Sequence, residues 1–391
     1  MIVNFGFNNF FSFKEGCEVS FSLDKRVLDT IPNKDGVGYI LGIKGANSSG
    51  KTNVVRGLSF LFNFVSKSSD RKVDQKLNFD PFFSSEEPSE FYIDFISNGY
   101  FYTYSCRINQ NKVFYEKLTR KLKREVTVFH REMDNVKECL SELKELKKIK
   151  LRTNASVISI LDRFNFESSM ADLDDVKSFF SRIICNVSYA GLHDGIILNN
   201  ISEVSKSYYD APSIFSFAKD IIKSADPSIS DIRICKNKNN ETGEDTYFPL
   251  FKHDYCGQSH ELIYLDESNG TQAIFNKMAM YWAVLHTGGI LALDEFDIHL
   301  HAMLLPKIIA LFEMESTNKL GAQFLFTAHN TEIMDYLGKY RTILVDKNNL
   351  ESYCYRLDEM PSTLVPNLTV RSDRKLSGLY LKKKLGGVPD L

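Results

Sequence analysis

The sequence lacks long apolar runs, and it lacks the cysteine patterns typical of metal sites and disulfide frameworks. No apolar run approaches the roughly 18 to 20 residues that span a bilayer, and the N-terminal residues have no basic segment followed by an apolar stretch. We therefore expect a cytoplasmic protein without membrane contact. The seven cysteines are scattered, odd in number and without a CxxC pair, so we interpret them as reduced thiols.

An excess of charge of one sign is also absent. The chain has 48 Lys and Arg residues against 50 Asp and Glu residues, so it has no overall electrostatic attraction to nucleic acid or to an anionic membrane. Any such contact would need a local basic patch. With 391 residues, 43% of them hydrophobic and 25% charged, the composition excludes wholesale disorder and is typical of one large globular domain or two ordinary ones.

The first part of the chain predicts strands around one helix. Alternating apolar residues over 3–7 and 17–23 predict a β-hairpin. The compact apolar run 39–43 predicts a strand, and apolar residues at helical spacing over 53–65 predict a helix after it. Residues 91–118 predict an antiparallel meander, because an Asn-Gly pair of the favoured hairpin type separates two alternating segments there.

The chain changes character near residue 120, where basic residues outnumber acidic ones. Apolar residues recur every three positions over 140–149 and continue over 157–164 and 176–187, so we interpret roughly 130–225 as a helical insertion. Its basic surface is either a solvated helix face or a surface for nucleic acid or a partner. The basic residues are Arg120, Lys121, Lys123, Arg124, Arg131, Lys137, Lys144, Lys147, Lys148, Lys150 and Arg152.

The last third of the chain predicts strands that alternate with helices. The polar segment 237–246 predicts an exposed hairpin loop, and 262–265 predicts a strand before a helix over 271–286. Three further strands are predicted at 290–293, 323–327 and 342–345, with a helix near 301–315. Apolar strands alternating with helices indicate a parallel sheet covered on both faces.

The segment GANSSGKT, residues 45–52, matches the pattern G-x-x-x-x-G-K-[ST] in full. A strand is predicted before it and a helix after it, which would direct backbone N–H groups and the positive helix end at a triphosphate. Lys51 would reach the β- and γ-phosphates of ATP, and the Thr52 hydroxyl would ligate Mg²⁺. The predicted nucleotide-binding residues here are Gly45, Asn47, Ser48, Ser49, Gly50, Lys51, Thr52 and Asn53.

A phosphate-binding loop needs a second metal ligand from a carboxylate elsewhere in the chain. The segment ILALDE, residues 290–295, has four apolar residues that predict a buried strand, followed by two acids. We therefore predict that Asp294 holds Mg²⁺ and that Glu295 activates the attacking water. The alternative is a solvated acidic turn.

A histidine follows the next predicted strand. His329 would lie beside the γ-phosphate, where its imidazole can hydrogen-bond a phosphoryl oxygen, so we predict a catalytic role for it; the alternative is a structural histidine. His299 and His301 follow Glu295 closely, and we interpret them as interface or packing residues rather than metal ligands.

These residues resemble the ATP-binding-cassette ATPases, in the branch of structural-maintenance-of-chromosomes heads, RecF-type proteins and overcoming-lysogenization-defect nucleases. The resemblance implies a signature sequence that precedes the acidic motif of Asp294 and Glu295. Ser268 and Gly270 match its serine and second glycine, whereas Glu267 and Asn269 depart from it. In this family the signature contacts the ATP of a partner subunit, so the resemblance implies a homodimer or higher oligomer through the ATP sites.

The same resemblance assigns two further loops. Residues 296–299 match the place of the dimer-interface loop, and the glutamine loop has no counterpart, because neither Gln75 nor Gln110 has a convincing context. The implied fold class is α/β, an ABC-ATPase head with a mixed or parallel central sheet, an antiparallel β subdomain and an inserted helical subdomain. The expected units are a first ATPase lobe at 1–125, a helical insertion at 126–230 and a second lobe at 231–391.

The whole chain resembles a narrower bacterial group of stand-alone ATPases that look like components of anti-phage and abortive-infection systems. The resemblance rests on GANSSGKTN, ESNGTQ, LALDEFDIHLH, FTAHN and a tail from Arg371 to Pro389. It implies a nucleotide-dependent switch or scaffold that controls a separately encoded effector such as a nuclease or toxin. One alternative is a RecF-like or SMC-like DNA-binding repair ATPase that uses the basic insertion and tail to contact DNA or RNA; a self-contained nuclease and a transporter subunit fit less well.

Overall fold

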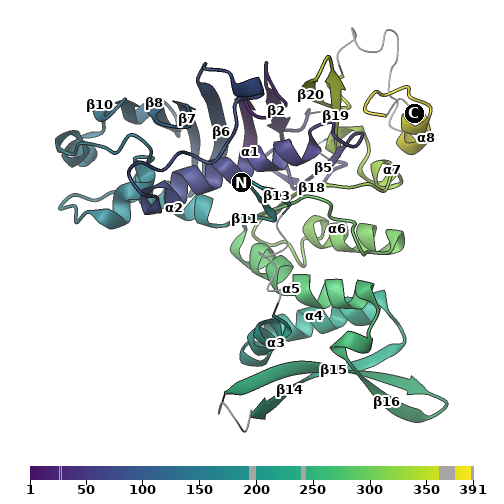
Figure 1. Cartoon of the computed structure of the whole chain (residues 1–391). Coiled ribbons are helices and arrows are strands. Elements are labelled where there is room, and N and C mark those ends of the chain that lie inside the picture. Colours follow the sequence, from purple (N-terminus) through teal and green to yellow (C-terminus); the bar gives the residue numbers. More distant parts are fainter. Residues whose placement is uncertain (26, 28, 193–199, 239–243, 361–374, 389–391) are drawn as a thin grey trace.

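The structure is a computed structural model that describes residues 1–25, 27, 29–192, 200–238, 244–360 and 375–388. At its centre lies a six-stranded sheet with the order β11-β17-β18-β5-β19-β20 (Figure 1). The first five strands run parallel to their neighbours, and β20 pairs antiparallel with β19, so the sheet is mixed. The strands are β11 Ile183–Cys185, β17 Ile290–Leu293, β18 Gln323–Thr327, β5 Ile40–Lys44, β19 Thr342–Asn348 and β20 Glu351–Arg356.

Helices and a second sheet cover both faces of the central sheet, as the apolar strands predicted. Alternate residues of a strand point to opposite faces, so Leu41 and Ile43 join one hydrophobic cluster with α1, whereas Phe324 and Phe326 join another with α5 and α6. The helices concerned are α1 Lys51–Lys67, α5 Asn269–Thr287, α6 Leu305–Glu313 and α7 Ile333–Leu337. In the part of the chain that is described, no helix is both long and apolar enough to cross a membrane.

A seven-stranded antiparallel sheet packs on the α1 side, with the order β10-β9-β8-β7-β6-β1-β2. The predicted N-terminal hairpin and the meander are confirmed, and Asn98 and Gly99 both have positive φ, as the favoured two-residue turn requires. The strands are β1 Ile2–Asn8, β2 Cys17–Ser20, β6 Ser89–Ser97, β7 Tyr100–Ile108, β8 Val113–Lys121, β9 Glu125–Glu132 and β10 Asn135–Cys139. The remaining short strands are β3 Asn33–Lys34, β4 Val37–Gly38, β12 Val187–Ser188 and β13 Gly191–Leu192.

The prediction of a helical insertion over 130–225 is wrong for much of that segment. β9 and β10 continue the antiparallel sheet, and β11 belongs to the central sheet. Of the apolar residues spaced three apart, Leu143 and Leu146 lie on a 3₁₀ helix over Ser141–Lys148, where three residues per turn place them on one side, and Leu140 and Ile149 flank it. Helical segments do occur at η4 Ile158–Arg163, α2 Ala171–Ser181, α3 Ile201–Asp210 and α4 Pro212–Ala225.

A separate lobe projects below the central sheet in Figure 1. It combines α3, α4 and the beginning of α5 with a three-stranded antiparallel sheet of the order β14-β15-β16. The predicted hairpin loop lies between β14 and β15, and its residues 239–243 lie outside the described residues. The predicted strand at 262–265 ends early, because residues 264–266 form a 3₁₀ turn before α5. The strands are β14 Ile229–Lys238, β15 Asp245–Tyr255 and β16 Gln258–Ile263; a last helix, α8 Leu376–Leu381, lies near the C-terminus.

Candidate nucleotide-binding site

The carboxyl ends of four neighbouring parallel strands meet at one edge of the central sheet. In register, Cys185 lies beside Ala292, Leu293 beside Phe326, and Thr327 beside Ile43. The polar residues that follow these strand ends therefore gather at the same edge. Ligand sites of open α/β sheets lie at this edge.

The predicted phosphate-binding loop connects β5 to α1 at this edge. Ser48 and Gly50 both have positive φ, with values of 62° and 111°, so successive N–H groups turn toward the inside of the loop. Gly50 is also tightly enclosed, because a Cβ there would lie 2.7 Å from Ser352 Oγ. A Cβ on Gly45 would lie 2.2 Å from the Val345 carbonyl oxygen. Both glycines are therefore required by the shape of the loop.

Lys51 begins α1 and is almost fully buried. Its Nζ donates to the carbonyl oxygens of Gly45 and Ala46, at 3.0 and 2.8 Å. Burial lowers the pKa of Lys51 below its ordinary value, and the nearby carboxylates of Asp294 and Glu295 partly oppose this shift. The ammonium group thus lies within the loop, beside the N–H groups that would receive phosphate.

Asp294 follows β17 and connects three parts of the chain. Its carboxylate accepts hydrogen bonds from Thr52 Oγ1 at 2.7 Å and from Thr327 Oγ1 at 2.6 Å. Asn186 fixes the backbone of Asp294, because its side chain accepts from the Asp294 N–H at 2.7 Å and donates to the Asp294 carbonyl at 2.9 Å. The structure thus brings together Thr52 and Asp294, the two predicted metal ligands, which lie 242 positions apart in the chain.

Glu295 and His329 lie next to each other, 3.6 Å apart between Glu295 Oε1 and His329 Nε2. The Glu295 N–H donates to Thr327 Oγ1, and Glu295 has a φ of 52°, a left-handed conformation that is uncommon for a residue with a side chain. Such conformations are concentrated at functional sites. Both side chains are partly exposed, so each can contact a bound ligand.

Two residues that sequence reasoning did not assign to the site support the segment around His329. Asp297 accepts hydrogen bonds from the N–H groups of His329 and Asn330, at 2.9 and 2.7 Å. Lys44, at the end of β5, donates to the carbonyl oxygens of Ala328 and His329. Burial lowers the pKa of Lys44 to about 8, while Asp297 partly opposes and Lys51 adds to this shift.

The candidate signature residues lie at the beginning of α5. Ser268 is the N-cap of this helix, and its Oγ accepts a hydrogen bond from the Thr271 N–H at 3.1 Å. Gly270 faces the loop after Glu295, because a Cβ there would lie 3.3 Å from the His299 carbonyl oxygen. The Glu267 carboxylate, which departs from the signature pattern, is buried and pairs with His253 of β15 at 2.7 Å.

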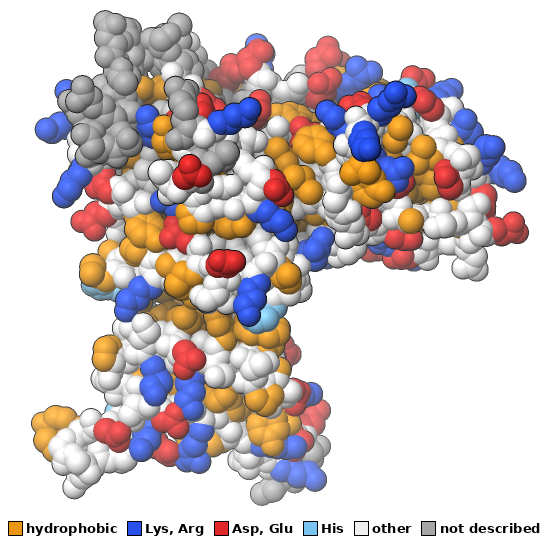
Figure 2. Space-filling view, turned by 180° about the vertical axis from the view of Figure 1, so that it is seen from behind, with side chains coloured by type: hydrophobic (Ala, Val, Ile, Leu, Met, Phe, Trp, Pro, Cys, Tyr) orange, Lys and Arg blue, Asp and Glu red, His pale blue; other side chains and the backbone are white. Residues whose placement is uncertain are grey.

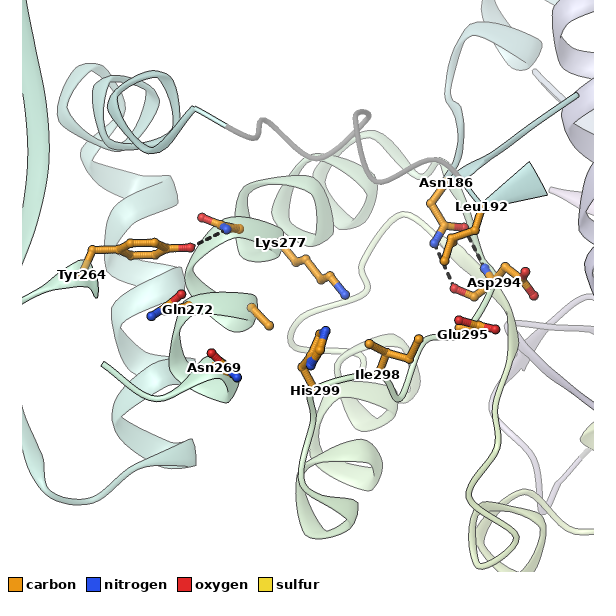
Figure 3. A pocket seen from close by; sticks show the side chains of 12 residues that line it. Asn186, Leu192, Tyr264, Asn269, Gln272, Lys277, Asp294, Glu295, Ile298 and His299 are labelled. Atoms are coloured by element: carbon orange, nitrogen blue, oxygen red, sulfur yellow. Dashed lines mark hydrogen bonds between the residues drawn. The ribbon is translucent and has the colours of Figure 1, made fainter. Parts of the chain in front are cut away.

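A cavity of about 420 Å³ lies between the beginning of α5 and the segment that follows β17. Figure 3 shows Asn269 and Gln272 of α5 on one side, and Asp294 and Glu295 on the other. Lys277 extends from α5 between the two sides (Figure 3). The cavity therefore keeps this part of α5 apart from the carboxylates of Asp294 and Glu295.

The residues at this edge suit a nucleotide triphosphate with Mg²⁺. Ser49 Oγ is buried and has no hydrogen-bond partner among the residues that the structure describes, and it lies beside loop N–H groups arranged for an anion. Mg²⁺ is commonly held by one or two carboxylates together with phosphate oxygens and water, and Asp294 with Thr52 provides the protein share of such a set. Among the described residues, no group of three or more His, Cys, Asp or Glu side chains is placed to hold a metal ion.

The remaining predicted residues are placed as follows. Asn47 and Ser48 are exposed in the loop, whereas Asn53 donates to Ser12 Oγ at 2.9 Å and accepts from Arg56 at 2.8 Å. His299 is exposed, and His301 accepts a hydrogen bond from the Met303 N–H. Gln110 donates to the carbonyl oxygen of Phe79 and Gln75 lies in an exposed turn, so neither gains a place in the site.

The sequence did not indicate Asn186, Thr327 or Lys44 as parts of the site, and it did not indicate that Asp297 would bind the backbone of His329 and Asn330. The only local signal for Asn186 was its place directly after the short apolar strand 183–185. Thr327 and Asp297 lay inside segments already singled out for His329 and for the dimer-interface loop, but their partners are more than thirty residues away in the chain.

Comparisons with known proteins were made by sequence and by structure. No curated protein sequence matches the chain. Three solved structures are similar in fold: an Smc head bound to the C-winged helix domain of ScpA, and Smc head domains from Pyrococcus furiosus and Pyrococcus yayanosii. The first has 14% identity and a TM-score of 0.48, covering 93% of this chain and 99% of that chain. The other two have 12% and 11% identity with TM-scores of 0.41 and 0.44, each covering 91% of this chain and 96% of its own.

A family match covers the elements that build the candidate site. Residues 40–335 match the family described as "AAA domain, putative AbiEii toxin, Type IV TA system". The matched range begins at β5 and ends within α7, so it includes the phosphate-binding loop, the beginning of α5, Asp294 and His329. The chain therefore belongs to this AAA-domain family.

Proposed function

We propose that this chain binds ATP with Mg²⁺, hydrolyses it, and acts as a nucleotide-dependent switch in a bacterial anti-phage defence system. The observation that supports ATP chemistry most directly is the 2.7 Å hydrogen bond between Thr52 and Asp294. It joins the phosphate-binding loop to the carboxylate of a neighbouring strand, where a Mg²⁺ would take ligands from both residues.

Each residue at the site has a proposed role. Lys51 and the loop N–H groups bind the phosphates, and Thr52 with Asp294 holds the metal ion. Glu295 accepts a proton from the attacking water, and His329 hydrogen-bonds the terminal phosphate. Bound Mg²⁺ would neutralise phosphate charge.

The site is proposed to be completed by a second copy of the chain. Asn269, which lies between Ser268 and Gly270 at the positive end of α5, is across the cavity from Asp294. In a head-to-tail homodimer this helix end would contact the phosphates bound by the partner. ATP would then hold the two protomers together, and hydrolysis would release them.

The role in defence is supported by the family description, which names a putative AbiEii toxin and a type IV toxin–antitoxin system. We propose a cytoplasmic protein that controls a separately encoded effector, a nuclease or a toxin.

The alternative of a DNA-binding repair ATPase has less support, because the side chains of three arginines in the basic segment are bonded to other parts of the chain. Arg131 pairs with Glu116 in the interior, Arg120 pairs with Asp172, and Arg152 donates to backbone carbonyls. The tail residues Arg371 and Arg374 lie outside the described residues.

Separate measurements of ATP binding and hydrolysis test this proposal. Lys51→Ala should lose ATP binding, because the buried ammonium group is removed from the loop. Glu295→Gln should keep ATP binding and lower hydrolysis on the order of 10²- to 10⁴-fold, because the proton acceptor is lost. The exposed Lys319 and Glu315 provide matched controls, and Lys319→Ala and Glu315→Gln should behave as wild type. Undiminished hydrolysis by Glu295→Gln would contradict the assigned role.

A further inference from the structure

Two cysteines meet where the antiparallel sheet joins the central sheet. Cys17 lies on β2 and Cys354 on β20, 337 positions apart in the chain, and their Sγ atoms lie 2.6 Å from each other. Each of these strands is the edge strand of its sheet. Both cysteines are reduced thiols in this structure.

Hydrogen bonds on both sides of the cysteines connect β20 to β2 and to the residues that flank β2. Two positions before Cys354, the Ser352 N–H donates to the Ser12 carbonyl oxygen at 2.7 Å. Two positions after it, Arg356 donates to the carbonyl oxygens of Ser20 and Ser22, at 2.9 and 2.6 Å. Ser352 Oγ also lies 2.7 Å from Ser12 Oγ. Alternate side chains of a strand point to one side, so the side chains of Ser352, Cys354 and Arg356 form a row along β20, with the Cys354 thiol in the middle.

The two thiols differ in their access to solvent. Cys17 is buried, and burial raises the pKa of its thiol well above the ordinary value. Cys354 is half-buried, and its Sγ also lies 3.5 Å from the Glu18 carbonyl oxygen at an exposed position. A small oxidant would therefore reach Cys354 first, and Cys17 lies where it can attack the oxidised sulfur.

We propose that Cys17 and Cys354 are an oxidative modification site, which hydrogen peroxide converts into a disulfide between β2 and β20. The Cys354 thiolate attacks one peroxide oxygen, so the O–O bond breaks, a sulfenic acid forms and the leaving hydroxide takes up a proton as water. The Cys17 sulfur then attacks the Cys354 sulfur, the S–O bond breaks, and the hydroxyl leaves as a second water with the Cys17 proton. One peroxide is reduced and two thiols are oxidised. Two molecules of a small thiol such as glutathione reduce the disulfide by exchange, and they leave joined as glutathione disulfide.

The disulfide would reinforce the wall behind the phosphate-binding loop. Ser352 of β20 donates to the Ser49 carbonyl oxygen at 2.6 Å, and its Oγ lies where a side chain on Gly50 would be. Because the sulfur atoms are already in contact, the cross-link needs little movement of either strand. We therefore expect greater resistance to unfolding and an unchanged affinity for ATP.

Mass spectrometry of the full chain after peroxide treatment tests the proposal. The intact mass should fall by about 2 Da, which corresponds to the loss of two hydrogens. After alkylation under denaturing conditions, two of the seven cysteines should be protected, and peptide mapping should recover Cys17 joined to Cys354. Glutathione should restore alkylation of both. Equal alkylation of all seven after peroxide treatment, or a cross-link between other cysteines, would overturn the proposal.

Single variants separate this cross-link from general oxidation. Cys354→Ser should abolish the 2 Da loss, and Cys17→Ser should leave a sulfenic acid on Cys354 that dimedone traps. Cys256→Ser removes an exposed cysteine and should still form the cross-link. Peroxide should raise the melting temperature of wild type and of Cys256→Ser on the order of 5 °C, and that of Cys354→Ser not at all. ATP affinity should be the same before and after oxidation; a loss of binding would contradict the expected geometry.

Discussion

At the scale of single residues, the ionisation of Lys44 makes the free energy of unfolding depend on pH. The side chain is 5% exposed and donates to backbone carbonyls beside His329, and burial lowers its pKa from 10.5 to about 8. Between these two values the unfolded chain binds a proton that the folded chain has lost. The contribution of Lys44 to the free energy of unfolding is therefore constant below about pH 8 and rises with pH from there to 10.5.

A comparison with Lys44→Met isolates this contribution from the other groups that titrate in the same range. Urea denaturation should show that wild type gains stability relative to the variant between about pH 7 and about pH 9.5, because methionine fills the site but does not titrate. The exposed Lys319 gives a matched control, and Lys319→Met should follow wild type at every pH. A difference between wild type and Lys44→Met that is independent of pH would show that Lys44 has its ordinary pKa.

At the scale of helices and strands, the pair of His253 and Glu267 joins the lower lobe to the beginning of α5. The Glu267 side chain is 4% exposed, and His253 Nε2 lies 2.7 Å from its carboxylate. His253 lies on β15, whereas Glu267 directly precedes the N-cap Ser268. A movement of the three-stranded sheet would therefore be passed to the residues proposed to contact the partner's ATP.

Replacing one residue of this pair should lower the stability of the fold more than replacing both. His253→Leu leaves a buried carboxylate without its partner, so we expect the free energy of unfolding to fall by about 1 to 3 kcal/mol. Hydrolysis should fall as well, with ATP binding unchanged, since the phosphate-binding loop is elsewhere. The double variant His253→Leu and Glu267→Leu should recover much of the stability. Chemical denaturation of the four members of this cycle provides the measurement, and additive effects would indicate that the two residues act independently.

The elements also show what sequence could predict and what it could not. β5, its loop and α1 were predictable, because the glycines, Lys51 and the helical apolar spacing are contiguous. β17 with Asp294 was predictable for the same reason. β9 and β10 were not, since their strand identity depends on pairing with β8 rather than on a local pattern. The contacts of Asn186 and His253 join separate elements, and no pattern within one sequence encodes such pairs.

At the scale of the whole molecule, the two halves of the proposed ATP site are on different parts of one protomer. In Figure 1, α5 lies between the lower lobe and the central sheet, and β5 and α1, which the phosphate-binding loop connects, lie above it. Figure 2 shows positive and negative side chains mixed over the face in view, so that face carries no large patch of one charge.

Association of two copies should therefore depend on ATP and on Ser268. With ATP and Mg²⁺, Glu295→Gln should accumulate as a dimer in light scattering, because the nucleotide that joins the protomers is not hydrolysed; without ATP it should be monomeric. Adding Ser268→Arg should prevent this dimer while each protomer still binds ATP, since the large side chain obstructs the exposed end of α5. Ser316→Arg, at an exposed position after α6, is the matched control and should leave the dimer intact. A dimer that persists with Ser268→Arg would place the interface elsewhere, and the site would then have to act within one protomer.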